Sequence, residues 1–194
     1  CQAFQVAAEK RMAFRRQENG GEMAFGLVQL GLCATSLRDA EMSYEIVDWL
    51  ANDYWRPNMV TTHNPKSLFN TDLCGGLPAI IIKMLVASQP GWIELLPALP
   101  KEWPTGRIEG VCCRGQIEVR SLAWNGNQLT VTLRSGVAQK IQLRLPGGIQ
   151  SIEVKQGPRS TLGKPTEGGG QVVTLPAGHE VTFAIVQAKR TPGK

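Results

Sequence analysis

The sequence predicts an α+β chain in two parts, with helices in the first half and short strands in the second. Apolar residues recur at helical spacing through the first half, whereas apolar and polar residues alternate through the second. The dipeptide Asn125-Gly126, between two alternating runs, is typical of a tight β-hairpin. We therefore expect a helical part over residues 1–90 and an antiparallel β-sandwich over residues 91–188.

Four helices are predicted in the first half, over residues 2–16, 22–37, 38–55 and 77–88, with a break at Asn19–Gly21. Asp39 and Glu41 stand in the first turn of the third helix, where negative charge is favourable. Pro78 stands in the first turn of the fourth helix, where its missing N–H does no harm. A long polar connection separates the third helix from the fourth.

The second half contains short alternating runs separated by Gly and Pro turns. Residues 91–106 join the halves and carry three prolines and two tryptophans, which indicates a rigid seam rather than a flexible linker. His179 is expected at a solvated turn before a strand. Residues 189–194 are expected to form a frayed tail.

Composition excludes several classes of protein. Hydrophobic residues make up 42% and charged residues 19% of the 194, as in an ordinary globular protein. The net charge of +5 comes from scattered basic residues, so no nucleic-acid partner is expected. The longest apolar run, LPAIIIKMLVA, is too short to cross a membrane and contains Lys83, so we expect no membrane association.

The cysteines do not form a recognisable metal site or disulfide framework. They contain no C-x-x-C pair and have no histidine at zinc-ligand spacing. We expect buried free thiols, with no metal and no cofactor. The five are Cys1, Cys33, Cys74, Cys112 and Cys113.

The stretch LFNTDLCGGLPA contains the main candidate for chemistry, Asp72. The residues around Asp72, taken alone, indicate that it forms a cap or an Asx-turn before a helix that begins near Pro78. It is also a possible catalytic carboxylate. His63 lies in the polar connection just upstream, and its residue type and position are equally compatible with a structural and a functional role.

An ordered set of motifs over residues 67–129 resembles the C-terminal region of glycoside hydrolase family 95, the inverting α-L-fucosidases and their relatives. The motifs are an Asp before Gly-Gly, a helix ending in Met-Leu, LLPALP, Trp then Gly, a strand with Arg-Gly, and a later Trp before a hairpin. Family members commonly read I-D-G-N-F-G-G, whereas this chain reads TDLCGG, one residue shorter.

The resemblance implies that residues 1–90 are the last helices of an (α/α)6 catalytic barrel, followed by the C-terminal β-domain. It implies hydrolysis of α-linked L-fucose or L-galactose with inversion, which needs an acid and a base about 6.5 to 9.5 Å apart. Asp72 corresponds to the family aspartate on the water-activating side, and His63 to a histidine that contacts sugar hydroxyls.

We group Asn70 with His63 as substrate-binding residues. The acidic glutamate of the family, and the asparagines that act with the aspartate, would lie upstream, so this chain alone is expected to be inactive. The expected partners are a fucosylated or L-galactosylated glycan and the upstream part of the same enzyme. We expect a periplasmic or extracellular location, with its signal upstream.

A second hypothesis is a non-catalytic carbohydrate-binding or scaffold fragment. Its β-sandwich would bind glycan through exposed aromatic residues, chiefly Trp124 and Phe183. A third hypothesis is an interaction domain in which Asp72 is only a helix cap, buried against backbone amides.

Overall fold

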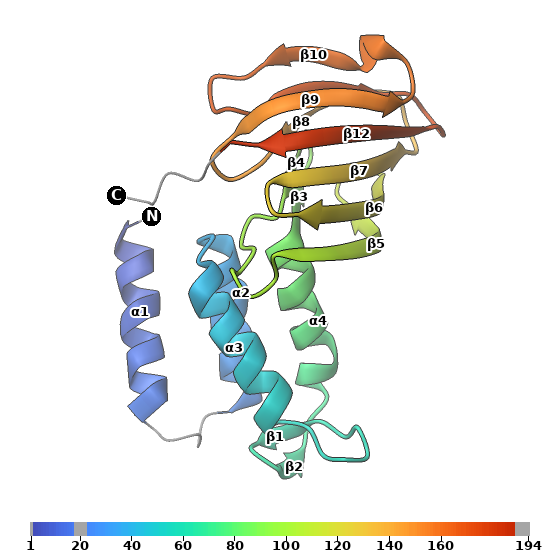
Figure 1. Cartoon of the computed structure of the whole chain (residues 1–194). Helices are drawn as coiled ribbons and strands as arrows, with labels where there is room; N and C mark the ends of the chain where they lie inside the picture. The colour runs from blue at the N-terminus through green and yellow to red at the C-terminus, as the bar shows by residue number, and fades with distance from the viewer. Residues whose placement is uncertain (1, 18–22, 189–194) are drawn as a thin grey trace. The chain divides into compact units, whose positions relative to one another are not determined.

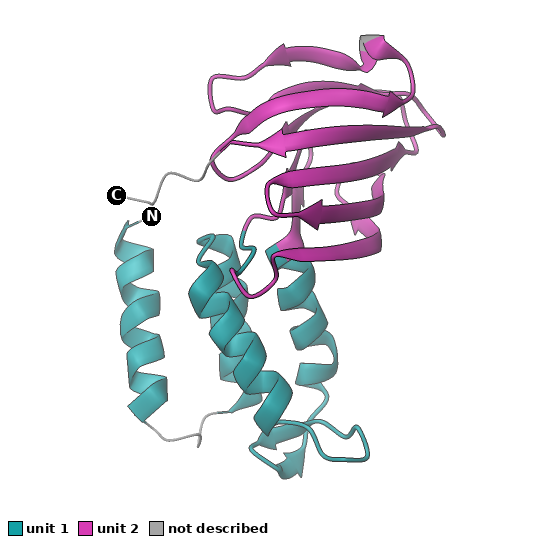
Figure 2. Cartoon of the chain, viewed as in Figure 1, with its two compact units in different colours: residues 1–84, 98–100 teal, residues 85–97, 101–194 magenta. Residues whose placement is uncertain are grey.

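A computed structural model describes residues 2–17 and 23–188, apart from the side chain of Ser160 (Figure 1). The break at Asn19–Gly21, Cys1 and the tail at 189–194 lie outside the described residues. The chain divides into two compact units, shown in Figure 2. The helical unit is Cys1–Met84 with Ala98–Pro100, and the β unit is Leu85–Pro97 with Lys101–Lys194. The division thus falls after Met84, six residues before the one that the periodicity predicts.

The helical unit contains helices where the apolar spacing predicts them. It comprises α1 (Gln2–Gln17), α2 (Ala24–Ser36), α3 (Ala40–Asp53), a small hairpin of β1 (Thr62–Asn64) and β2 (Ser67–Phe69), and α4 (Asp72–Leu85). Asp39 caps α3, since its side chain accepts a hydrogen bond of 2.9 Å from the backbone N–H of Met42.

Helix α1 is held by polar contacts as well as by its buried Met12. The side chain of Gln5 donates a 2.7 Å hydrogen bond to Asp39. Arg16 donates two hydrogen bonds to the carboxylate of Glu45, one from Nε and one from Nη2. This pairing raises the pKa of the Arg16 guanidinium, because its hydrogen bonds to the Glu45 carboxylate favour the charged form.

Glycines let the helices of this unit approach closely. A Cβ at Gly31 of α2 would stand 2.6 Å from Cδ1 of Ile80 in α4 and 3.1 Å from Cγ2 of Ile46 in α3. A Cβ at Gly76 of α4 would stand 2.5 Å from Cγ2 of Val28 in α2. The core of the unit is therefore built around α2, with α3 and α4 packed against it.

The fourth helix differs from its predicted bounds at both ends. It begins at Asp72 rather than at Leu77, so Pro78 lies inside it. It ends at Leu85, because the next residues form a hairpin of β3 (Val86–Gln89) and β4 (Trp92–Leu95). Pro90 and Gly91 make the two-residue turn, in which Gly91 adopts a φ of 89°. Part of the predicted seam over 91–106 is therefore a sheet strand.

The β unit contains two five-stranded sheets, with strand orders β10-β11-β8-β4-β3 and β5-β6-β7-β12-β9. The remaining strands are β5 (Thr105–Cys113), β6 (Ile117–Asn125), β7 (Gln128–Ser135), β8 (Gln139–Arg144), β9 (Ile149–Gln156), β10 (Leu162–Pro165), β11 (Gln171–Leu175) and β12 (Glu180–Gln187).

Among the described residues, the strands of the β unit pair antiparallel except for β4 with β8, and an isolated parallel bridge joins Ser135 to Ala177. Strand β4 runs parallel to β8, with Ile93 opposite Leu143, so the prediction of a wholly antiparallel architecture is wrong there. Strands β5, β6 and β7 separate β4 from β8 in the chain, so no tight hairpin joins the two strands and a parallel pairing is possible. The predicted hairpin at Asn125-Gly126 is confirmed, because Asn125 pairs with Gln128 across the turn.

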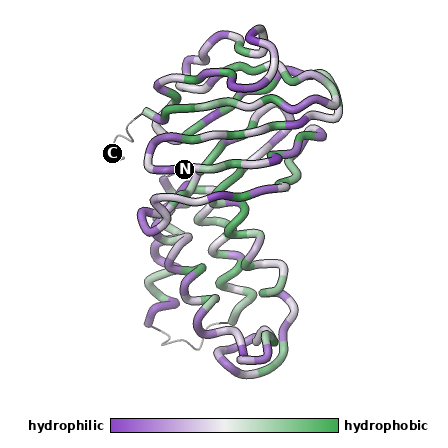
Figure 3. Tube along the Cα trace, turned by 45° about the vertical axis from the view of Figure 1, so that its right-hand side comes forward, coloured by the Kyte–Doolittle hydropathy of each residue, from purple (hydrophilic) through white to green (hydrophobic). Residues whose placement is uncertain are grey.

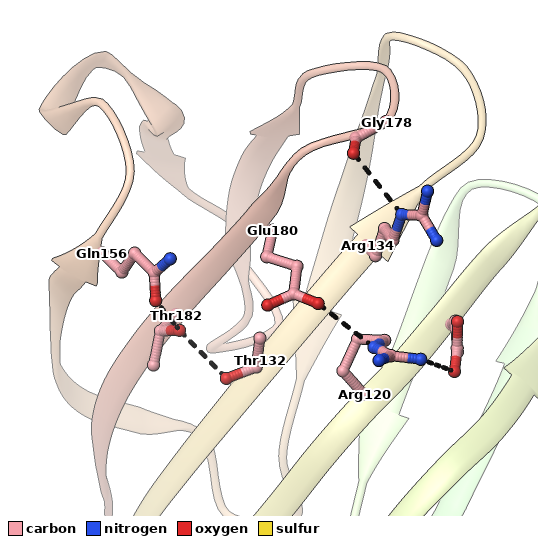
Figure 4. A network of polar contacts seen from close by, with 8 residues as sticks. Arg120, Thr132, Arg134, Gln156, Gly178, Glu180 and Thr182 are labelled. Atoms are coloured by element: carbon pink, nitrogen blue, oxygen red, sulfur yellow. Dashed lines mark hydrogen bonds and ion pairs between the residues drawn. The ribbon is translucent and has the colours of Figure 1, made fainter.

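In β7 and β12, every second residue is buried, so each strand has one buried side. Figure 3 shows the hydropathy of each residue along the chain. The opposite side of the sheet β5-β6-β7-β12-β9 carries paired polar groups (Figure 4). Arg120 binds both Glu118 and Glu180, and Thr132 shares a 2.9 Å hydrogen bond with Thr182. The two carboxylates raise the pKa of the exposed Arg120 guanidinium through their hydrogen bonds and charge.

Four of the cysteines are free thiols, but the expectation that they are buried is wrong for three of them. Cys33, Cys74 and Cys112 are exposed, whereas Cys113 is half-buried. Their neighbours in the sequence are apolar, yet each lies on the outer side of its helix or strand. Helical and strand geometry, rather than local hydrophobicity, therefore decides their exposure.

Candidate functional site

The connection between α3 and α4 is tied to the end of α3 by backbone contacts. Thr62 donates hydrogen bonds of 2.9 Å from its N–H and 3.1 Å from its hydroxyl to the carbonyl of Tyr54, whose side chain is fully buried. Thr61 is 1% exposed and pairs with Asn70, accepting from its N–H at 3.1 Å and donating its hydroxyl to its carbonyl. These contacts hold the loop at the start of α4.

The start of α4 is capped by Asn70, not by Asp72. The side-chain oxygen Oδ1 of Asn70 accepts a 2.6 Å hydrogen bond from the backbone N–H of Asp72, which is the first residue of the helix. Asp72 itself is exposed. The hypothesis of Asp72 as a cap buried against amides is therefore wrong, and the capping role belongs to its neighbour.

The three residues that the sequence analysis assigns to the site lie together. Nδ2 of Asn70 donates a 2.8 Å hydrogen bond to Oδ2 of Asp72 and lies 3.2 Å from Nδ1 of His63. His63 comes from β1, Asn70 follows β2, and Asp72 opens α4. His63 and Asn70 are half-buried, so the cluster is anchored on one side and open at the carboxylate.

The carboxylate of Asp72 has one fixed and one open oxygen. Oδ2 accepts from Asn70, whereas Oδ1 accepts no hydrogen bond from the described residues. A negative charge at the first turn of a helix is also favoured by the free amides there. The arrangement can therefore hold an ionised carboxylate with one oxygen available to a water molecule or a hydroxyl group.

Two residues of the cluster were not predicted. Thr61 holds the backbone of Asn70, and its hydroxyl oxygen lies 3.3 Å from Sγ of Cys74, which is exposed two residues after Asp72. Cys74 stands two residues after Asp72 in the stretch LFNTDLCGGLPA, and this closeness could have suggested it as a member of the cluster. The contacts of Thr61 depend on the loop returning to α4, which local sequence does not encode.

Within the described ranges, no group of three or more His, Cys, Asp and Glu residues is placed to hold a metal ion. No helix among the described residues has the length and apolar character needed to cross a membrane. His179 is exposed just before β12, as predicted.

A family model supports the resemblance seen in the sequence. The model described as "Glycoside hydrolase family 95, C-terminal domain" matches residues 87–185, which is just over half of the chain. The match begins after α4 and covers most of the β unit. His63, Asn70 and Asp72 therefore lie upstream of the matched range.

The chain is also similar to one curated protein and to solved structures of other hydrolases. It is 41% identical over 68 residues to "Alpha-L-fucosidase 2" of Arabidopsis thaliana, a match that covers 34% of this chain and 8% of that protein. The chain thus spans a small fraction of the length of that relative.

Two family 30 enzymes show weak structural likeness. An endoxylanase from Clostridium papyrosolvens C71 has a TM-score of 0.31 and 17% identity, covering 43% of this chain and 24% of its own. The xylanase Xyn30A from Clostridium acetobutylicum has a TM-score of 0.32 and 10% identity, covering 87% of this chain and 40% of its own. Neither likeness is close enough to bear on fold or function.

Proposed function

We propose that this chain, which belongs to glycoside hydrolase family 95, is the C-terminal part of an inverting enzyme that removes terminal α-L-fucosyl or α-L-galactosyl residues from glycans. The helical unit would supply the last helices of an (α/α)6 barrel, and the β unit the C-terminal β-sandwich. The upstream part of the same enzyme would supply the rest of the barrel and the general acid.

The observation that carries this proposal is the hydrogen-bonded cluster of His63, Asn70 and Asp72 at the start of α4. Family membership supports glycoside hydrolysis, and the similarity to a protein named as an α-L-fucosidase supports the choice of sugar. The cluster adds a carboxylate that is held on one oxygen and open on the other, as a water-activating group requires.

In the proposed reaction, Asp72 acts on the water-activating side of the sugar. The water oxygen forms a bond to the anomeric carbon while the bond from that carbon to the glycosidic oxygen breaks. The proton of the water passes to the basic side, and the proton of the upstream acid passes to the leaving oxygen. His63 would bind a sugar hydroxyl. The expected contact of Asn70 with substrate stays a prediction.

Replacing the carboxylate in the complete enzyme tests the role of Asp72. Asp72→Asn should lower kcat/KM on a fucosyl substrate by about 10²- to 10⁴-fold, the usual contribution of a general base. Asp48→Asn removes an exposed carboxylate of α3 and should leave kcat/KM unchanged. Near-normal turnover by Asp72→Asn would remove Asp72 from the mechanism.

The stereochemical outcome tests inversion separately. Proton NMR of the complete enzyme acting on an α-L-fucoside should show the β-anomer of the free sugar first, before mutarotation. Initial release of the α-anomer would refute an inverting mechanism even if Asp72 proved essential.

The alternative hypothesis of a non-catalytic carbohydrate-binding fragment is weakened by the burial of its two chief aromatic residues. Trp124 is 7% exposed and Phe183 is fully buried, so neither can stack on a glycan. Their predicted exposure is wrong because both point to the buried side of their strands, where alternation places them. These two residues were the chief candidates of that hypothesis.

A further inference from the structure

We propose that Asn70 is a positioning residue that fixes two partners at once, the carboxylate rotamer of Asp72 and the proton tautomer of His63. This role rests on the proposed function for its catalytic meaning, but the hydrogen-bond arrangement can be tested without any turnover. It differs from substrate binding, because the carboxamide nitrogen of Asn70 already faces two groups of the protein.

The orientation of the Asn70 carboxamide follows from its three neighbours. Oδ1 lies 2.6 Å from the backbone nitrogen of Asp72, which can only donate, and Nδ2 lies 2.8 Å from Oδ2 of Asp72, which accepts. The reversed orientation would set an NH₂ group against an N–H and an oxygen against a carboxylate. Both reversed contacts are repulsive, so the observed orientation is the one that the surroundings allow.

This orientation fixes the proton on His63. Nδ2 of Asn70 carries two hydrogens and no lone pair available to accept, and it uses one hydrogen for Asp72. The second hydrogen points to Nδ1 of His63 at 3.2 Å, so Nδ1 must be the acceptor. Neutral His63 then carries its proton on Nε2. A donor N–H is thereby available on the far side of the ring for an oxygen of the substrate.

The same carboxamide limits how the Asp72 side chain turns. Oδ2 accepts from Asn70 while the Asp72 backbone N–H donates back to Asn70, so the two residues are joined in both directions. Rotation of the carboxylate would break the bond to Oδ2. The open oxygen, Oδ1, therefore keeps one direction, as a positioned base needs.

A purely structural role for Asn70 makes a different prediction, and one substitution separates the two. Asn70→Asp keeps an oxygen that can accept from the N–H of Asp72, so the start of α4 stays capped. It removes both donated hydrogen bonds and sets a second carboxylate against Asp72 and His63. If Asn70 is only a cap, this change should have little effect.

The chain contains a matched control in the same loop. Oδ1 of the exposed Asn58 accepts from the backbone N–H of Val60, also two residues on, at 3.3 Å. Asn58→Asp therefore keeps the same kind of turn and adds the same charge, but away from the cluster.

Nitrogen-15 NMR of the 194-residue chain reads the tautomer directly, since His63 and His179 are its two histidines. At a pH where both rings are neutral, His63 should show the Nε2–H tautomer in the parent chain and in Asn58→Asp. In Asn70→Asp the carboxylate accepts from the ring, so the proton should move to Nδ1. An unchanged tautomer in Asn70→Asp, or an Nδ1–H tautomer in the parent chain, would overturn the proposal.

Kinetics of the complete enzyme give the second measurement. Asn70→Asp should lower kcat by about 10²-fold, the scale of a misplaced catalytic group, in an enzyme that still folds and unfolds cooperatively. Asn58→Asp should match the parent. Unchanged kcat in Asn70→Asp would refute the positioning role if Asp72→Asn is inactive. If Asp72→Asn keeps its turnover, the proposed function fails instead, and the tautomer measurement still decides the role of Asn70.

Discussion

Single residues in the β unit are constrained by shape as much as by polarity. Trp124 packs across its strand partner Gly106, and its indole N–H donates a 2.9 Å hydrogen bond to the carbonyl of Trp103. A Cβ at Gly106 would stand 2.3 Å from Cζ2 of that indole. The tryptophan is therefore a core residue, and the glycine opposite is part of the same packing arrangement.

Gly106→Ala should destabilise the β unit by about 1–3 kcal/mol, because the added methyl group would overlap the buried indole and force it to shift. The measurement is the free energy of unfolding in denaturant. Gly168→Ala is the control, since its Cβ would meet nothing within 4 Å and its φ is not positive. Equal stability of the two variants would show that the indole can repack.

The adjacent thiols Cys112 and Cys113 should differ in reactivity. Burial raises the pKa of the Cys113 thiol, although its hydrogen bond to Ser88 acts in the opposite direction. Less thiolate is therefore present at a given pH, and alkylation of Cys113 should be slow and should accelerate as the pH rises.

Iodoacetamide labelling followed by mass spectrometry can measure this difference in Cys112→Ser and Cys113→Ser variants. The exposed Cys112, left by Cys113→Ser, should be labelled first. Faster labelling of Cys113 near neutral pH would contradict the effect of burial.

At the scale of elements, helix α4 combines a packing surface with a functional end. Its Gly-Gly pair is not a break before the helix but part of it. Gly76 faces α2, where Val28 occupies the space that a side chain would need, whereas Gly75 faces away from any neighbour within 4 Å. The close approach of α4 to α2 places Asp72 at a defined position at the end of the helix.

The two glycines should respond in opposite ways to alanine. Gly76→Ala should destabilise the helical unit by about 1–3 kcal/mol, since Val28 is β-branched and stiff. Gly75→Ala should be neutral or should stabilise by up to about 1 kcal/mol through helix propensity. Thermal unfolding of both variants measures the difference, and a Gly76→Ala variant as stable as the parent would show that Val28 can move out of the way.

At the scale of the whole molecule, our proposal gives this chain one of the two catalytic groups, the carboxylate of Asp72, and not the whole active site. The family match covers residues 87–185, and the similar curated protein is far longer than this chain. The proposed acid belongs to the upstream part of the enzyme, so its chemistry needs groups that come from more than one region of the sequence.

The 194-residue chain alone should therefore show no measurable hydrolysis of an α-L-fucoside, whereas the complete enzyme should turn over the same substrate. The assay is release of free L-fucose at matched concentrations. Turnover by the chain alone, lost again in Asp72→Asn, would mean that the acid lies within these residues and that the proposed division of the site is wrong.

The sequence predicted the helices of the first half, the hairpin at Asn125-Gly126 and the grouping of His63, Asn70 and Asp72 as a candidate site. The sequence did not predict the start of α4 correctly, because Gly75, Gly76 and Pro78 are local signals against a helix. The packing of Gly76 against Val28 is a tertiary contact that outweighs those signals, and the local hydrogen bond from the Asp72 N–H to Asn70 starts the helix before them.

By itself, the sequence determined what depends on periodicity and short motifs: helices before strands, one buried side for strands such as β7 and β12, and membership of a hydrolase family. Only the tertiary structure decided what depends on distant contacts. It brought the loop back to α4 through the pairing of Thr61 with Asn70, and it set β4 parallel to β8. Such outcomes follow from which groups meet in space, and spacing along the chain does not encode them.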